Sequence, residues 1–292
     1  MNLHIRNLVK RFIPDQALSF LRFYRSQIKL ANGPKRSSLL QFEVHLADHC
    51  NLNCKSCSHF SPLAEENFME IDDFRHDCER LGKLTGGQIQ FIRFMGGEPL
   101  LHNQIIEFLD AGRNNFPKGE LIIVTNGILL PKQSESFWEN CQKNNVEIEI
   151  SNYPIKIDRD KINVSAGKYK VTVDYVGGKE KIMWRAMKLD MNGRQNIKEN
   201  FGMCSQSNTC IHLNKGRLFT CPVTAYIQYF NGYFGENLQI TKDDYIDIYK
   251  AENIDEILDF LCKPIPFCRY CNVKEEKNIK WAVSEKDIQE WS

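Results

Sequence analysis

Three cysteines within eight residues constrain this chain more than any other feature of its sequence. Cys50, Cys54 and Cys57 form the pattern C-x3-C-x2-C directly after the strand-like segment 41–46. Soft thiolates select zinc, copper(I) or iron–sulfur centres, and a structural zinc site needs four protein ligands. With no fourth cysteine nearby, the pattern favours a [4Fe-4S] cluster with one iron open to a small molecule. The spacing alone establishes only a metal or a cluster.

Strand and helix patterns alternate from residue 41 onward. We expect strands at 41–47, 88–94, 120–125, 146–151 and 169–175, and helices at 71–84, 104–116 and 134–143. Such alternation implies β-α-β units and a parallel sheet. Right-handed crossovers then bring the carboxyl ends of the strands to one edge, where these folds carry their chemistry. Four segments follow predicted strand ends, namely the cysteine run, 95–98, 125–127 and 151–153.

These motifs resemble those of radical S-adenosylmethionine (SAM) enzymes, over about residues 41–180. Gly96-Gly97-Glu98 stands where that family has its Gly-Gly-Glu motif, one strand after the cysteines. The resemblance implies that Cys50, Cys54 and Cys57 hold a SAM-binding [4Fe-4S] cluster. It also implies contacts of SAM with Gly96, Gly97, Glu98, Asn126, Ser151 and Asn152.

The resemblance to radical SAM enzymes implies both a fold and a reaction. The implied fold is α/β, a partial (β/α)6 TIM-like barrel over residues 39–195. The implied reaction is reductive cleavage of SAM to a 5′-deoxyadenosyl radical, which removes hydrogen from an unactivated C–H bond. One departure concerns adenine, because the family often has an aromatic residue where this chain has Ser56. Phe60, or the backbone of the loop, could make that contact instead.

A second set of cysteines follows residue 200. Cys204 and Cys221 flank a predicted hairpin that turns at 214–216, and Cys268 and Cys271 follow as C-x2-C. This arrangement resembles the auxiliary-cluster modules called twitch and SPASM. The resemblance implies a small α+β module over residues 196–292 that holds an auxiliary [4Fe-4S] cluster through these four cysteines. Cys210 could replace Cys204 in that set.

Zinc is the alternative metal for the second set, because four thiolates also suit a zinc tetrahedron. The other cysteines do not fit a ligand pattern. Cys78 and Cys141 lie in predicted helices, and Cys262 ends an apolar helix predicted over 254–262, so we interpret all three as core residues.

Four protein ligands leave an auxiliary cluster no site for substrate, but it can accept an electron from a substrate radical. This logic favours net oxidation, or epimerisation, of a small sugar-, cyclitol- or nucleotide-sugar-like substrate. The alternatives are a radical SAM maturase that modifies a peptide or protein, and a non-catalytic zinc protein. A flavodoxin- or ferredoxin-type donor would supply the first electron.

The substrate-side acid or base is poorly marked. His59, His102, Tyr153 and Tyr175 follow or end predicted strands. We select Asp174 as the catalytic candidate, because an acid inside the apolar segment 171–175 needs a reason if it faces inward. Arg185 is a further candidate, as a fixed cation for a phosphate or an acid group.

The composition of the chain limits which partners it can bind and where in the cell we expect it. The 292 residues carry a net charge of +1, so no bulk field favours nucleic acid. With no signal-peptide pattern and no apolar run long enough for a membrane span, we expect a cytoplasmic protein. Residues 1–38 are strongly basic and contain a helical apolar stripe, namely Ala17, Phe20, Leu21, Tyr24 and Ile28. We favour a helix packed on the barrel over peripheral contact with anionic lipid or a membrane-bound enzyme.

Overall fold

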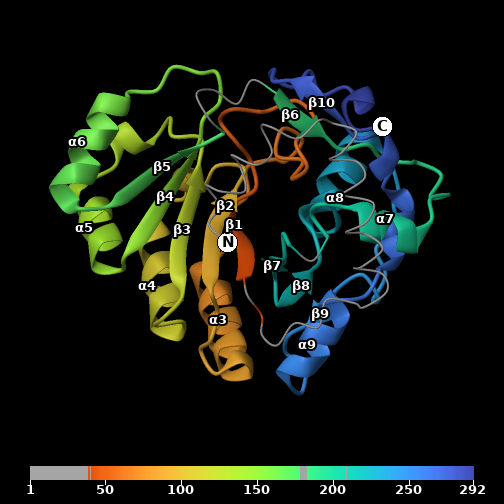
Figure 1. Ribbon diagram of the computed structural model, residues 1–292, viewed down its shortest axis with the longest axis horizontal. Coiled ribbons are helices and arrows are strands. Elements are labelled where there is room, and N and C mark those ends of the chain that lie inside the picture. The colour runs from red at the N-terminus through yellow and green to blue at the C-terminus, as the bar shows by residue number, and fades with distance from the viewer. Residues whose placement is uncertain (1–38, 40, 178–182, 208) are drawn as a thin grey trace, which may run out of the picture.

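The computed structural model describes residues 39, 41–177, 183–207 and 209–292 (Figure 1). The predicted basic helix within residues 1–38 therefore lies outside the described residues. Among the described helices, none is both long enough and apolar enough to cross a membrane.

An eight-stranded sheet is the centre of the described fold, in the order β5-β4-β3-β2-β1-β7-β8-β9 (Figure 1). Neighbours are parallel from β5 to β7, and the last two strands join antiparallel. The strands are β1 (Gln41–Ala47), β2 (Phe91–Gly96), β3 (Glu120–Thr125), β4 (Val146–Ser151), β5 (Thr172–Val176), β7 (His212–Asn214), β8 (Arg217–Phe219) and β9 (Ile246–Asp247). The predicted α/β class with a mostly parallel sheet is confirmed.

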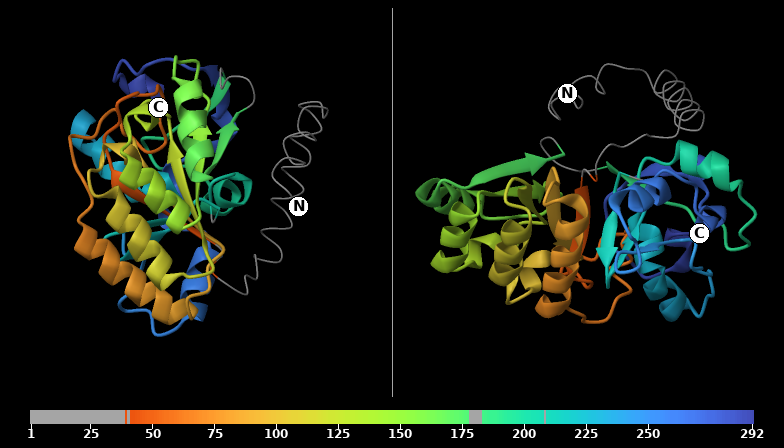
Figure 2. Two further views of the ribbon diagram at one scale, coloured as in Figure 1. Left: turned by 90° about the vertical axis from the view of Figure 1, so that its left-hand side faces the viewer. Right: turned by 90° about the horizontal axis from the view of Figure 1, so that it is seen from below.

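Four helices cover one face of the parallel strands (Figure 2): α3 (Ile71–Thr85), α4 (Ile105–Asn115), α5 (Glu135–Lys143) and α6 (Arg159–Tyr169). The alternation along β1 explains this packing, because Phe42 and Val44 are fully buried in the same core as Phe74 of α3. Two acidic residues lie in the first turn of α3, where their negative charges interact favourably with the helix dipole. Gly86, with φ of 63°, ends this helix.

The carboxyl-terminal third adds helices α7 (Ile197–Met203), α8 (Pro222–Phe234) and α9 (Ile254–Leu261). A short ribbon pairs β6 (Met183–Ala186) antiparallel with β10 (Lys277–Lys280). A second hydrophobic core forms here and includes Phe60, Phe230 and Trp291, all completely buried. The sheet joins this region to the rest of the fold, because β7 pairs directly with β1.

The sequence patterns missed three helices, α6, α7 and α8, for physical reasons. Helix α7 has only seven residues, too few for a clear apolar period. Helix α6 buries only Ile162, Ala166 and Tyr169, so it has little apolar periodicity, and it delays the start of β5 to Thr172. Helix α8 has the opposite character, because most of its residues are buried and no polar face marks the helical period. The hairpin of β7 and β8 is confirmed, with positive φ at Lys215 and Gly216.

Candidate active site

The first cysteine loop begins where β1 ends, at the edge of the sheet expected to carry the chemistry. The three thiols lie around Tyr153. Burial raises the pKa of the Tyr153 hydroxyl, and the nearby charges of Cys54, Cys57 and Cys50 raise it further. Burial likewise raises the pKa of Cys50 to about 11, and the charges of Glu98 and Cys57 add to the rise. Thiols held in this state would be deprotonated by a bound cationic centre, so the donor chemistry fits an iron–sulfur cluster.

The arrangement differs from that of a single-ion site. Across the described part of the chain, no group of three or more His, Cys, Asp or Glu side chains is arranged to hold one metal ion.

Gly96 and Gly97 allow the end of β2 to lie against the cysteine loop. Gly96 has φ of 145°, and a Cβ on Gly97 would lie 2.1 Å from the carbonyl oxygen of His49. The amide of Gly97 donates to the Ala47 oxygen at 2.8 Å, and that of Glu98 donates to the His49 oxygen at 3.2 Å. This close approach of backbones explains both glycines, and their contact with SAM stays a prediction.

Glu98 and Asn126 connect the neighbouring strand ends to this loop. Glu98 is fully buried, and its carboxylate accepts from the amides of Leu100 at 3.2 Å and Asn126 at 2.9 Å. Burial raises the pKa of this carboxyl to about 7. The side-chain amide of Asn126 donates to Asn51 Oδ1 at 2.7 Å and lies 3.9 Å from Cys50 Sγ. Asn126 is thus beside Cys50, and its contact with SAM stays a prediction.

The end of β4 contributes the remaining predicted SAM contacts. Asn152 is buried, its amide donates to the Val176 oxygen at 3.0 Å, and its side-chain oxygen accepts from Arg159. Ser151 is half-buried at the carboxyl end of the strand. The structure leaves both residues at the predicted edge, and their roles toward SAM stay predictions.

The carboxyl-terminal segment 281–291 packs on the cysteine loop, which the sequence did not predict. Its backbone pairs with the loop, because the Lys55 amide donates to the Ala282 oxygen at 2.9 Å and the Ser284 amide donates to the Asn53 oxygen at 2.8 Å. The Ser56 hydroxyl donates to the Glu290 oxygen at 2.6 Å. No local motif identifies such a contact, since more than 200 residues separate the partners.

The second cysteine set also converges. Cys204, Cys221, Cys268 and Cys271 line one small cavity together with Glu276. Burial and the nearby charges of Cys221 and Glu276 raise the pKa of Cys204 to about 11. Cys210 does not line this cavity, and the charges of Glu43, Arg93 and Cys204 all act on its thiol. The structure therefore brings together the four cysteines that the sequence selected, and their ligation of a cluster stays a prediction.

Asn200 organises the pair Cys268 and Cys271. Its side-chain amide donates to the Cys268 oxygen at 2.8 Å and also to the Cys271 oxygen. Asn200 belongs to α7 and is buried, so this helix fixes the loop that presents both thiols.

Other sequence candidates have different surroundings. Phe60 is completely buried against Phe230 and Trp291, so the suggestion that its ring contacts adenine is wrong. Arg185 forms an ion pair with Glu276 and donates to the Ser205 hydroxyl at 2.9 Å, so a carboxylate of the chain already neutralises it. Asp174 is exposed on the edge strand β5, and its catalytic role stays a prediction.

The three remaining cysteines match the core interpretation in part. Cys78 and Cys141 are fully buried, within α3 and α5, and burial raises the pKa of both. Cys262 follows α9 directly, is half-buried, and does not line the cavity of the second set.

A buried polar network lies on the other face of β1 and was missed. Glu43 and His45 alternate with the apolar residues of this strand and are both buried. Glu43 lies 3.0 Å from His212 Nε2 and 3.5 Å from Arg93 Nη1, while His45 Nδ1 lies 2.9 Å from Asp48 Oδ1. Glu43 and His45 lie two positions apart in a strand whose other residues are mostly apolar. This pattern in the sequence could have revealed the network.

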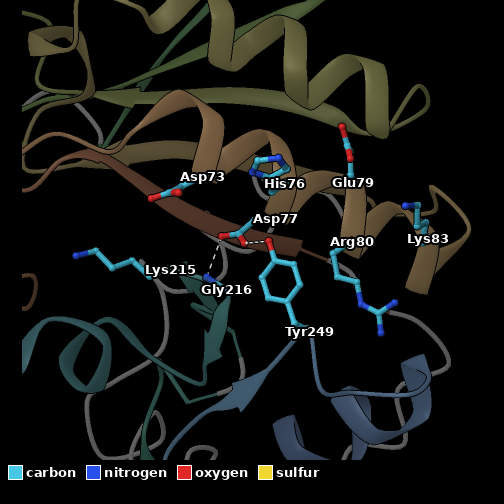
Figure 3. A pocket seen from close by; sticks show the side chains of 9 residues that line it. All are labelled: Asp73, His76, Asp77, Glu79, Arg80, Lys83, Lys215, Gly216 and Tyr249. Carbon is cyan, nitrogen blue, oxygen red and sulfur yellow. Dashed lines mark hydrogen bonds between the residues drawn. The ribbon is translucent and has the colours of Figure 1, made fainter.

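A cavity of about 660 Å³ lies away from both cysteine sets, between α3 and the turn of β7 and β8 (Figure 3). Charges of both signs line it. Asp77 points between Gly216 and Tyr249, accepting from the Gly216 amide at 2.9 Å and the Tyr249 hydroxyl at 2.7 Å. The arrangement fastens α3 to the carboxyl-terminal third of the fold.

Known proteins share part of this sequence. Residues 44–160 match the Radical SAM superfamily. The chain is 30% identical over 110 residues to GTP 3′,8-cyclase of Alkaliphilus oremlandii (strain OhILAs), covering 37% of this chain and 34% of that protein. It is 31% identical over 87 residues to the S-adenosylmethionine-dependent nucleotide dehydratase of Selenomonas ruminantium, covering 30% of each. The matches thus span only about a third of these relatives.

Among solved structures, BtrN in complex with AdoMet and 2-DOIA is similar with a TM-score of 0.47 and 15% identity, over 80% of this chain and 93% of that chain. The superfamily match begins within β1, six residues before the first cysteine of the loop, and continues through β4 to the start of α6. Residues 44–160 are therefore a radical SAM domain.

Proposed function

We propose that this protein is a radical SAM oxidoreductase that acts on a small sugar-, cyclitol- or nucleotide-sugar-like substrate. Cys50, Cys54 and Cys57 would hold the SAM-binding [4Fe-4S] cluster, which with SAM supplies a 5′-deoxyadenosyl radical when reduced. Gly97 and Glu98 fix the facing strand end against this loop, and Asn126 lies beside Cys50. The chain itself provides a fixed, largely buried frame for the radical chemistry.

One observation supports net oxidation over other radical SAM outcomes. Four cysteines from three separate segments line a single cavity, and no other described cysteine lines it. Four thiolates complete the coordination of an auxiliary [4Fe-4S] cluster and leave no open position for substrate, so the chemistry such a group supplies is that of an electron acceptor.

The ribbon of β6 and β10 connects the two sets of thiols. Glu276 lines the second cavity, and Trp281, five residues later, lies 3.1 Å from Cys54 Sγ. An extended chain rises about 3.3 Å per residue, so the two ends of this segment lie at most roughly 16 Å apart. An auxiliary cluster within that reach would accept the electron that the substrate gives up after losing a hydrogen atom and a proton.

The names of similar proteins indicate which substrates should be tested. The two relatives described above have names that specify a nucleotide substrate. GTP and other nucleotides should therefore be tested as substrates together with sugars and cyclitols. A flavodoxin- or ferredoxin-type protein is the proposed reductant.

Iron content tests the proposal directly. Anaerobically reconstituted protein should hold about eight irons, as two [4Fe-4S] clusters require. Incubation with SAM and dithionite should release 5′-deoxyadenosine. A protein that carries zinc in place of iron, or a cluster-replete sample that releases no 5′-deoxyadenosine, would refute the proposed function.

Two serine variants form a matched pair for the auxiliary site. Cys204→Ser should reduce the iron content to about four, because Cys204 lines the cavity of the second set. Cys210→Ser should retain about eight irons, because Cys210 does not line that cavity. The reverse result would assign the fourth ligand to Cys210.

A further inference from the structure

We propose that Trp281 and Tyr153 are positioning residues that donate hydrogen bonds to the Cys54 sulfur and thereby raise the reduction potential of the first cluster. The inference rests on the proposed cluster at Cys50, Cys54 and Cys57. Trp281 follows β10 and lies outside residues 44–160, whereas Tyr153 lies within them.

The geometry singles out Cys54. The indole Nε1 of Trp281 donates to Cys54 Sγ at 3.1 Å. The Tyr153 hydroxyl is also hydrogen-bonded to Cys54. Cys50 is instead approached by the backbone amides of Leu52, at 3.4 Å, and Asn53, while the Asn126 side-chain amide lies 3.9 Å away. Two uncharged donors from distant segments therefore meet on one sulfur, which is buried.

Packing holds both donors in place. The rings of Tyr153 and Trp281 lie 6.1 Å apart between centroids, and Trp184 of β6 lies 6.3 Å from Tyr153. Residues on either side of Trp281 are also fixed, because β10 pairs with β6 and Val283 bridges to Cys54. The indole N–H is thus preorganised toward the sulfur and reorients little when the charge of the cluster changes.

Hydrogen bonds to a cluster sulfur stabilise the reduced state, which carries one more negative charge. Removal of a donor should make reduction harder. This effect is separate from ligand identity, because Cys54 remains the ligand while the electron density on its sulfur is compensated less well.

The chain offers a matched control in Trp291. Its indole Nε1 donates to the backbone oxygen of Cys57 at 2.9 Å, so it contacts the same loop through the same chemical group without touching a sulfur. Trp281→Phe and Tyr153→Phe each remove a donor to sulfur while an aromatic ring remains. Trp291→Phe removes a donor to the backbone only.

The experiment measures the midpoint potential of the first cluster by redox titration followed by electron paramagnetic resonance, in full-length reconstituted protein. A second Cys204→Ser substitution in every protein removes the auxiliary signal. Trp281→Phe and Tyr153→Phe should each lower the reduced-to-oxidised ratio about tenfold at a fixed potential, which corresponds to about 59 mV for one electron. Trp291→Phe should leave the potential unchanged. Equal potentials in the parent and both sulfur-donor variants would overturn the inference, as would an equal shift in Trp291→Phe.

A second measurement does not depend on potentials. After exchange into deuterium oxide, the reduced parent cluster should show couplings from exchangeable deuterons, and Trp281→Phe should lack one of them. Retention of every coupling would overturn the role of Trp281. If a variant fails to fold, 3-benzothienylalanine at position 281 replaces the N–H by sulfur with almost the same ring shape, and the same loss is expected.

These outcomes are distinct from failure of the proposed function. Absence of iron, or of any SAM-dependent change in the signal of the parent protein, would refute the proposed function. A parent cluster that forms and binds SAM, with potentials insensitive to position 281, would refute only the inference.

Discussion

The hydroxyl of Thr125 donates to the carboxylate of Glu98 at 2.6 Å, and this bond joins the end of β3 to the segment that follows β2. Together with the amides of Leu100 and Asn126, it gives the fully buried carboxyl three donors within the protein. Glu98 is therefore a brace between two strand ends, in addition to any contact with SAM that the resemblance implies. The brace fixes the edge on which the cysteine loop rests.

This brace should make stability depend on pH. Burial raises the pKa of Glu98 from 4.5 to about 7, so between these values the folded protein retains a proton that the unfolded chain releases. The free energy of unfolding should therefore fall as the pH rises through this window. Relative to Glu98→Gln, the wild type should lose roughly 3 kcal/mol between pH 4.5 and 7.5. Urea unfolding of both metal-free proteins measures this difference, and parallel pH profiles would contradict it.

Replacement of Gly97 by alanine should prevent the cysteine loop from reaching the end of β2. The added Cβ would lie 2.1 Å from the His49 oxygen, a backbone atom that cannot move without displacing the loop. We expect Gly97→Ala to lower the free energy of unfolding by about 3 kcal/mol and to lose the iron of the first cluster. Gly167→Ala is the control, because a Cβ there meets nothing within 4 Å, and it should be neutral or stabilising by up to about 1 kcal/mol.

Loss of Asn200 should affect the second site selectively. Asn200→Ala leaves the carbonyl oxygens of Cys268 and Cys271 without their shared donor, which should cost about 1–3 kcal/mol. The two thiols should then be less well placed, and the iron content should fall toward that of a single cluster.

Asn231 provides the comparison for Asn200. It binds the backbone of Leu238 through both its amide, at 3.0 Å, and its oxygen, at 3.1 Å, but it does not contact a cysteine. Asn231→Ala should destabilise by a similar amount, measured by thermal unfolding, while the iron content is retained. Equal iron loss in both variants would show that the effect of Asn200 is general destabilisation.

The contact between α3 and the β7–β8 turn should contribute to stability without affecting iron. Asp77→Ala removes the acceptor for the Gly216 amide and the Tyr249 hydroxyl (Figure 3), and we expect a loss of about 2 kcal/mol. Glu79→Ala, at an exposed position of the same helix, should change stability by less than about 0.5 kcal/mol. Iron content should be normal in both, and a stability of Asp77→Ala equal to the wild type would contradict this role.

Short-range patterns in the sequence determined much of this protein. The alternation of strands and helices predicted the parallel sheet, because side-chain period and turn residues act over a few positions. The spacing of Cys50, Cys54 and Cys57 predicted a cluster-like site at a strand end, since parallel strands with right-handed crossovers leave one edge for such loops. The predicted hairpin between Cys204 and Cys221 also follows from local turn chemistry.

Only the tertiary structure decided which distant groups meet. The pairing of Trp281 with Cys54 spans 227 positions, and only the fold shows that Cys204, but not Cys210, lines the second cavity. The burial of Phe60 against Trp291 likewise arises from a core built by segments far apart in the chain. Packing of distant apolar surfaces carries no periodic signature in the sequence, so these contacts followed from the fold and not from any motif.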